Sequence, residues 1–146
     1  MNQEFSFNCR VYFEDTDAGG IVYYANYLKF CERARTEWLL KSGLSQQSLL
    51  KEKQGFVIRS IAANYLKSAR LEDFLKITVI PVKVGACGLK IFQQIYNQNS
   101  ELLFEFECSL AYIDFTTARP KPMPAEARTY IKSFMKADAE ALGVNN

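Results

Sequence analysis

Residues 10–38, which read RVYFEDTDAGGIVYYANYLKFCERARTEW, contain the pattern that decides the fold. The residues that lead into this stretch alternate between two faces, which predicts a strand that ends at Glu14 and buries Phe7, Cys9, Val11 and Phe13. From Ala25 onward, apolar residues recur at intervals of four, three and four, at Tyr27, Cys31, Ala34 and Trp38. This spacing predicts an amphipathic helix of roughly five turns. The stretch therefore joins a strand to a long helix through a short turn.

The turn is rich in carboxylates. Glu14, Asp15 and Asp17 are followed by Gly19 and Gly20, which allow the backbone to turn sharply. The first turn of a helix carries unpaired N–H groups and a positive dipole end, so it stabilises an anionic oxygen. A carboxylate just upstream is then placed to act as nucleophile or general base on the carbon that bears that oxygen. The alternative is a solvated acidic loop, since acidic residues also favour helix starts.

Downstream of the helix, the sequence predicts strands with little helix between them. Strands are expected over 55–67, from Leu75, over 89–96 and over 102–113, with short helices at 45–51 and after Pro124. Only one long helix is available to cover the sheet, so alternating β-α-β units are excluded. We expect an α+β fold, with an antiparallel sheet wrapped around the helix at 25–42. Neither face of the 55–67 strand is uniformly polar, which suits cover by a helix and by a neighbouring subunit.

Composition limits the class of protein. The 146 residues fit one domain, 1–146, in which we expect 137–146 to fray. A hydrophobic content of 49% with a net charge of +2 favours a globular protein that does not bind nucleic acid. No apolar run approaches the ~18 residues of a membrane span, and no targeting signal is recognisable, so a cytoplasmic location is expected.

Cysteine and histidine usage excludes several kinds of chemistry. The chain has no histidine, and its four isolated cysteines form no Cys-x-x-Cys pair: Cys9, Cys31, Cys87 and Cys108. We therefore expect no metal site and no cofactor, with free thiols in a reducing compartment. Catalytic triads that contain histidine and Cys–His dyads are excluded as well. Carboxylate chemistry remains possible.

The string RVYFEDTDAGGIVYYANYLKFCERARTEWL closely resembles the signature of the hot-dog-fold acyl-CoA thioesterases. The branch it resembles contains 4-hydroxybenzoyl-CoA thioesterase and the thioesterase encoded in bacterial Tol–Pal clusters, and a looser likeness continues to about residue 124. The resemblance implies a hot-dog fold with Asp17 as the catalytic carboxylate and the backbone N–H of Tyr24 at the oxyanion-binding helix start. It also implies substrate contacts from Gly19, Gly20, Val22 and Asn26.

The resemblance further implies a homodimer or homotetramer that binds acyl-CoA, or an acyl-carrier protein, at the subunit interface. The chain departs from the family in two places. Many Tol–Pal-type members carry histidine where this chain has Tyr24, so no role of that histidine carries over. The hydroxybenzoyl-CoA enzyme has a basic cluster where this chain reads VKVGACGLK, with only Lys83 and Lys90. Other basic residues are alternative phosphate ligands: Lys67, Arg70, Arg119 and Lys121.

Three functions follow from these observations. The first is an acyl-CoA thioesterase in which Asp17 attacks the thioester or activates water and the Tyr24 N–H binds the oxyanion. The second is a non-hydrolytic binding module of the same fold for acyl-CoA or acyl-carrier protein. The third is an interaction protein whose acidic turn is incidental. Hydrolysis separates the first two, and the third predicts no acyl-CoA binding.

Overall fold

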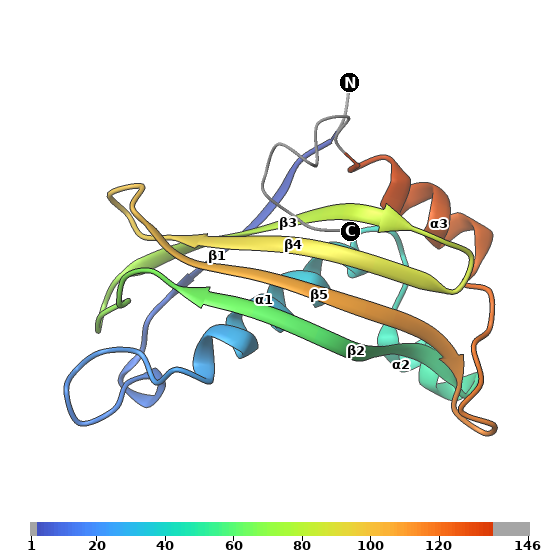
Figure 1. Ribbon diagram of the computed structural model, residues 1–146, viewed down its shortest axis with the longest axis horizontal. Helices are drawn as coiled ribbons and strands as arrows, with labels where there is room; N and C mark the ends of the chain where they lie inside the picture. Colours follow the sequence, from blue (N-terminus) through green and yellow to red (C-terminus); the bar gives the residue numbers. More distant parts are fainter. Residues whose placement is uncertain (1–2, 136–146) are drawn as a thin grey trace.

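The computed structural model describes residues 3–135 and shows a curved antiparallel sheet wrapped around one long helix (Figure 1). The sheet has five strands in the order β1-β3-β4-β5-β2. These are β1 (Phe5–Arg10), β2 (Gln54–Tyr65), β3 (Phe74–Val84), β4 (Gly88–Tyr96) and β5 (Leu102–Asp114). The helices are α1 (Asn26–Leu40), α2 (Gln46–Lys51) and α3 (Ala125–Lys132). The expected α+β hot-dog architecture is confirmed, while the expected fraying of 137–146 concerns residues outside the described range.

Helix α1 supplies one half of the core and the concave face of the sheet supplies the other. The predicted stripe is buried along its whole length, at Tyr27, Cys31, Ala34 and Trp38. The clearest alternation in the chain, on β5, likewise buries Phe104, Phe106, Cys108, Leu110 and Tyr112. Each large apolar side chain taken from water into such a core contributes roughly 1.5–3 kcal/mol. Gly43, three residues after the last residue of α1, has φ +85°, and this left-handed conformation is common just after a helix.

The structure corrects the expected bounds on both sides of the acidic turn. Strand β1 ends at Arg10, and Phe13 is 81% exposed instead of facing the core. The chain bends here because residues Phe13–Asp15 form a 3-10 turn, closed by a hydrogen bond from the Tyr12 N–H to the Asp15 carboxylate. Helix α1 begins at Asn26, one residue later than expected, and it ends two residues earlier than the predicted 42.

A buried polar pair joins α1 to the sheet inside the apolar core. Gln93 of β4 is fully buried, and its amide nitrogen donates to the Cys31 carbonyl at 3.1 Å. Its amide oxygen accepts a 2.9 Å hydrogen bond from the guanidinium of Arg35, which is also buried and lies over the Phe106 ring. Because a buried charge is costly without a partner, Gln93 both positions α1 and makes the Arg35 charge tolerable.

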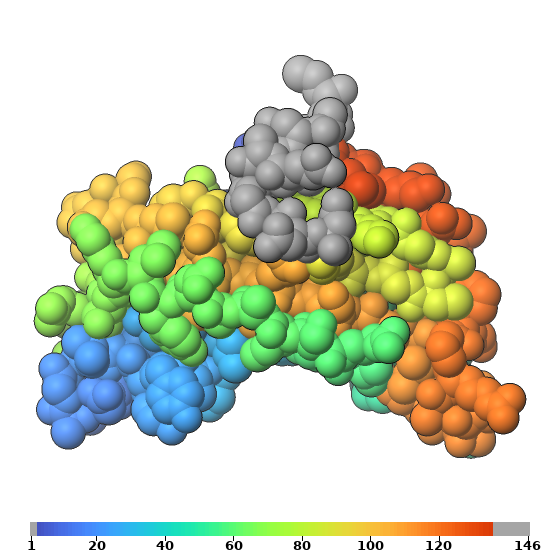
Figure 2. All heavy atoms as spheres, viewed as in Figure 1, coloured from blue at the N-terminus to red at the C-terminus, as the bar shows by residue number. Residues whose placement is uncertain are grey.

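The outer edge of β2 leaves twelve residues of strand without a strand partner within residues 3–135. The other edge of the strand pairs with β5. Ile58 and Ile61 on this strand are each 48% exposed. In Figure 2 the strand (green) runs uncovered along the hollowed lower side of the molecule.

Among the described residues, no helix is both long and apolar enough to cross a membrane.

Replacing Gln93 tests the buried pair. Gln93→Leu leaves the Arg35 charge without its acceptor, so we expect the free energy of unfolding, measured by urea denaturation, to fall by about 3 kcal/mol. Arg35→Met combined with Gln93→Leu removes the charge as well and should recover much of that loss. Simple addition of the two single losses would show that the two side chains are not coupled.

Candidate active site

The three acids of the turn have different environments, and Asp15 is the buried one. Its side chain is only 4% exposed. One carboxylate oxygen accepts from the Tyr12 N–H at 2.8 Å, and the other accepts from the Asn26 side-chain amide at 2.9 Å. Its backbone carbonyl accepts from the Tyr23 N–H at 3.0 Å. Asp15 therefore ties the end of the first strand to the first residue of α1, which is a structural role.

Asp17, in contrast, is exposed at the base of a small loop. One carboxylate oxygen, Oδ1, accepts from the Gly19 N–H at 3.0 Å. The backbone closes the loop through hydrogen bonds from Asp17 N to Ile21 O and from Gly20 N to Asp17 O. Gly20 has φ +74°, a conformation that side chains disfavour, so glycine fits the loop at this position. The second oxygen, Oδ2, makes no hydrogen bond with residues 3–135, which leaves it available to a ligand or water.

Tyr24 lies in the turn that leads into α1, two residues before the helix begins. No acceptor within residues 3–135 takes a hydrogen bond from its backbone N–H. Its carbonyl accepts a 2.8 Å hydrogen bond from the Tyr65 hydroxyl, which fixes the peptide from the side of the sheet. Partial burial, and then the neighbouring Tyr27 phenol, raise the pKa of Tyr65, so this hydroxyl stays protonated and donates at neutral pH.

One cavity of about 400 Å³ brings the acid and this turn together. We call it the Asp17 cavity, and it is lined by Asp17, Ile21, Val22, Tyr23, Tyr24, Tyr27, Tyr65, Leu66, Lys67 and Ser68. Of the residues proposed from the sequence, Asp17, Val22 and Tyr24 line it. The other three lie outside its lining: Gly19 and Gly20 shape the loop that holds Asp17, and Asn26 binds Asp15.

Sequence reasoning missed the aromatic wall of this cavity. Tyr65, at the end of β2, packs edge to face on Tyr27 of α1, with ring centroids 5.2 Å apart. The Tyr27 hydroxyl in turn accepts from the Ala69 N–H at 2.9 Å. Both tyrosines belong to elements that the sequence predicts, but nothing in the local pattern indicates that the end of β2 meets the start of α1.

Comparison with known proteins places the chain in a family. The model of the thioesterase-like superfamily matches residues 11–131, which includes the whole acidic turn and the sheet from β2 to β5. The chain belongs to this superfamily. The match covers far more than half of the 146 residues, so membership does not depend on the signature stretch alone.

Individual relatives agree with this family. The acyl-CoA thioesterase YbgC of Haemophilus influenzae is 39% identical over 129 residues, which cover 88% of this chain and 94% of the relative. The acyl-CoA thioester hydrolase YbgC of Escherichia coli O157:H7 is 41% identical over 82% of this chain and 90% of its own length. Among solved structures, the Staphylococcus aureus protein SAV2348, determined in complex with CoA, superposes with a TM-score of 0.88 at 19% identity, covering 100% of this chain and 96% of that one. The last likeness supports the hot-dog fold.

The different environments of Asp15 and Asp17 predict that the same substitution destabilises the protein strongly at Asp15 and hardly at all at Asp17. Asp15→Ala leaves the Tyr12 N–H and the Asn26 amide unpaired, so we expect the free energy of unfolding to fall by about 3 kcal/mol and the melting temperature by about 8 °C. Asp17→Ala is the matched control, and because Asp17 is exposed it should change the melting temperature by less than about 2 °C. Calorimetry measures both. An equal loss in the two variants would contradict the structural role given to Asp15.

Proposed function

We propose that this protein is an acyl-CoA thioesterase that hydrolyses a thioester to a free acid and CoA. The observation that carries the proposal is the pairing, at one cavity, of a carboxylate with a free oxygen and a backbone N–H without an acceptor, Asp17 and Tyr24. The printed activities of the YbgC relatives, at about 40% identity over most of the chain, support the same reaction. The substrate is the thioester of CoA or of an acyl-carrier protein.

The proposed chemistry gives each group one task. Asp17 either removes a proton from a water that attacks the thioester carbon, or attacks that carbon itself to form an anhydride that water then hydrolyses. The carbonyl oxygen becomes an oxyanion, which the Tyr24 N–H and the positive end of α1 stabilise. The carbon–sulfur bond then breaks and the thiolate takes up a proton. The proposed chemistry uses only the backbone N–H of Tyr24, so its side chain is given no task.

Asp17→Asn tests the assigned acid. The amide keeps the size of the side chain but cannot act as nucleophile or base, so kcat should fall by at least ~100-fold while the melting temperature hardly changes. The measurement is steady-state hydrolysis of short, long and aromatic acyl-CoAs. Glu14→Gln, a change of the neighbouring exposed acid, is the control and should retain most of the activity. A rise in KM alone would contradict the role given to Asp17. A wild-type protein that binds acyl-CoA without turnover would favour the non-hydrolytic module.

We also propose that the active species is a homodimer or a larger homo-oligomer. The support is the β2 edge, which presents twelve residues of strand with two half-exposed isoleucines, Ile58 and Ile61. Such an edge pairs readily with another strand, and a second copy of β2 is a self-complementary partner. Tyr65, which lines the Asp17 cavity, is the last residue of this strand, so assembly and the site share one element.

A cytoplasmic location remains part of the proposal, and the four free cysteines suit a reducing compartment.

Dilution tests the assembly. Specific activity should stay constant while light scattering shows the oligomer, and it should fall over the concentration range in which the oligomer dissociates. Ile61→Lys, which places a charge on the exposed part of β2, should shift both transitions to higher protein concentration. Lys29→Glu on the exposed side of α1 is the charge-change control. A fully active monomer would refute this part of the proposal.

A further inference from the structure

A second, more polar cavity adjoins the Asp17 cavity. It has a volume of about 420 Å³ and is lined by Lys67, Ser68, Arg70, Asp73, Asn97, Gln98, Asn99, Glu101 and Leu103. We call it the polar cavity. Lys67 and Ser68 line both cavities, so the two cavities lie next to each other at these residues. Lys67 is also the one cationic side chain among the described residues that line the Asp17 cavity.

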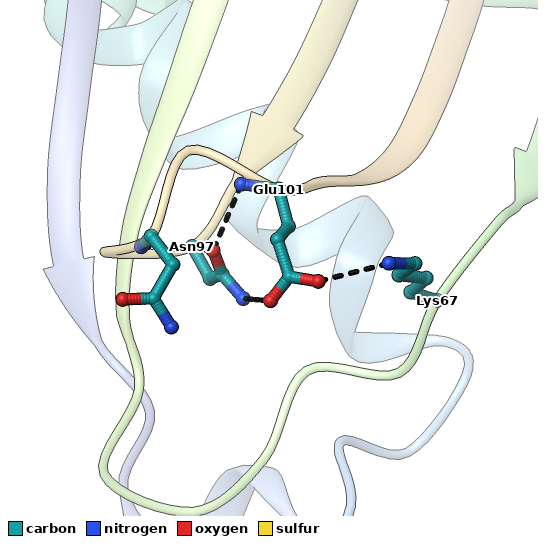
Figure 3. A network of polar contacts seen from close by, with 4 residues as sticks. Lys67, Asn97 and Glu101 are labelled. Carbon is teal, nitrogen blue, oxygen red and sulfur yellow. Dashed lines mark hydrogen bonds and ion pairs between the residues drawn. The ribbon is translucent and has the colours of Figure 1, made fainter.

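Lys67 is held at this boundary by a network that Figure 3 shows. Its ammonium group lies 2.8 Å from one carboxylate oxygen of Glu101, and the Asn97 amide donates to the other oxygen at 2.9 Å. The Asn97 side-chain oxygen accepts from the Glu101 N–H at 3.0 Å, so the carboxylate is fixed from two sides. The hydrogen bond from Lys67, and then that from Asn97, lower the pKa of Glu101, so the carboxylate is ionised at neutral pH.

Arg70 supplies a second cation to the polar cavity. Its backbone is fixed, because its N–H donates to a carboxylate oxygen of Asp73 at 2.9 Å and the residue bridges to Ile21. Its guanidinium, however, has no hydrogen bond or ion pair with residues 3–135. The Asp73 carboxylate is already occupied on both oxygens, by the Arg70 N–H and by the Gln98 amide. The guanidinium is therefore available to an external anion.

We propose that Lys67 and Arg70 bind the phosphate of the phosphopantetheine arm that carries the acyl group, a proposal that rests on the thioesterase function. The phosphate is part of the arm in CoA and in acyl-carrier protein alike, so both substrates present the same group. Exposed ion pairs such as Lys67–Glu101 are weak, whereas a phosphate offers charge-assisted hydrogen bonds to an ammonium and a guanidinium together. When the substrate binds, the Lys67 ammonium is therefore expected to leave the Glu101 carboxylate and to bind the phosphate.

The basic residues near the β3–β4 turn fit this role less well. Lys90 is engaged by Glu107 at 2.9 Å. Lys83 and Lys90 face each other in the β3–β4 register, at the end of β4 away from the Asn97 turn. At ~3.3 Å per residue, the part of β4 from Lys90 to the Asn97 turn is roughly 20 Å long. Lys67 lines both cavities and Arg70 lines the polar cavity, whereas Lys83 and Lys90 line neither of them.

Three thioesters of the same acid test the proposal, on pantetheine, on 4′-phosphopantetheine and on CoA. Lys67→Met should raise KM for the two phosphorylated substrates by roughly tenfold relative to the acyl-pantetheine, with kcat little changed. Arg70→Met should act in the same direction, and Lys132→Met on the exposed side of α3 is the control. An equal effect on all three substrates, or none, would overturn the proposal. So would a phosphate-dependent loss in Lys83→Met that Lys67→Met does not show.

Glu101→Gln separates a phosphate site from a merely structural ion pair. The amide still accepts from Asn97 but no longer competes for Lys67, so KM for the phosphorylated substrates should fall, by roughly twofold to fivefold. If the Lys67–Glu101 pair only held the loop, Lys67→Met and Glu101→Gln would break the same contact and change KM in the same direction. That outcome would refute the phosphate site.

Binding measurements keep the phosphate site testable apart from turnover. Calorimetric titration of Asp17→Asn with 4′-phosphopantetheine and with pantetheine should show a preference for the phosphorylated arm. That preference should be lost when Lys67→Met is added. If it persists, the phosphate site is wrong even in an active thioesterase. If the wild type hydrolyses none of the thioesters while the Lys67-dependent preference is present, the thioesterase function fails and the phosphate site stands.

Discussion

The buried carboxylate of Asp15 is the constraint on which the site depends. Its two carboxylate oxygens and its backbone carbonyl accept hydrogen bonds from Tyr12, before the turn, and from Asn26 and Tyr23, after it. Because Asp15 joins these groups, the loop that carries Asp17 and the turn that carries Tyr24 are held in a fixed position relative to each other. The exposed acid can then be reactive without also holding the fold together, since its neighbour two residues away does that.

Two elements far apart in the sequence complete the site. The end of β2 lies beside the start of α1 because the edge strand and the helix run in opposite directions, and their tyrosines pack where they meet (Figure 1). The segment that follows β2 brings Lys67 to the same place and connects it to the Asn97 turn between β4 and β5. The Asp17 cavity thus has an aromatic wall on one side and a charged boundary on the other.

Local patterns were sufficient for most of the fold. The spacing of Tyr27, Cys31, Ala34 and Trp38 predicted α1, and the alternation along 102–113 predicted β5. The strand before the turn was extended too far because the period of two continues through Val11 and Phe13, whereas the side chain of Asp15 bends the backbone there. The alternation reflects only which residues are apolar, so it cannot predict a bend that a side-chain hydrogen bond causes.

The site was less predictable for the same reason. Asp17, Val22 and Tyr24 came from a contiguous motif, while Tyr65 enters through a contact between residues 41 positions apart. The hydroxyl of Tyr65 joins the last residue of an edge strand to the peptide next to the acid. A partner strand that orders the edge of β2 therefore also orders the Tyr24 peptide. In the proposed assembly, an unpaired monomer holds this turn less firmly than a subunit of the dimer does. Newly synthesised chains would then hydrolyse thioesters more slowly until they assemble.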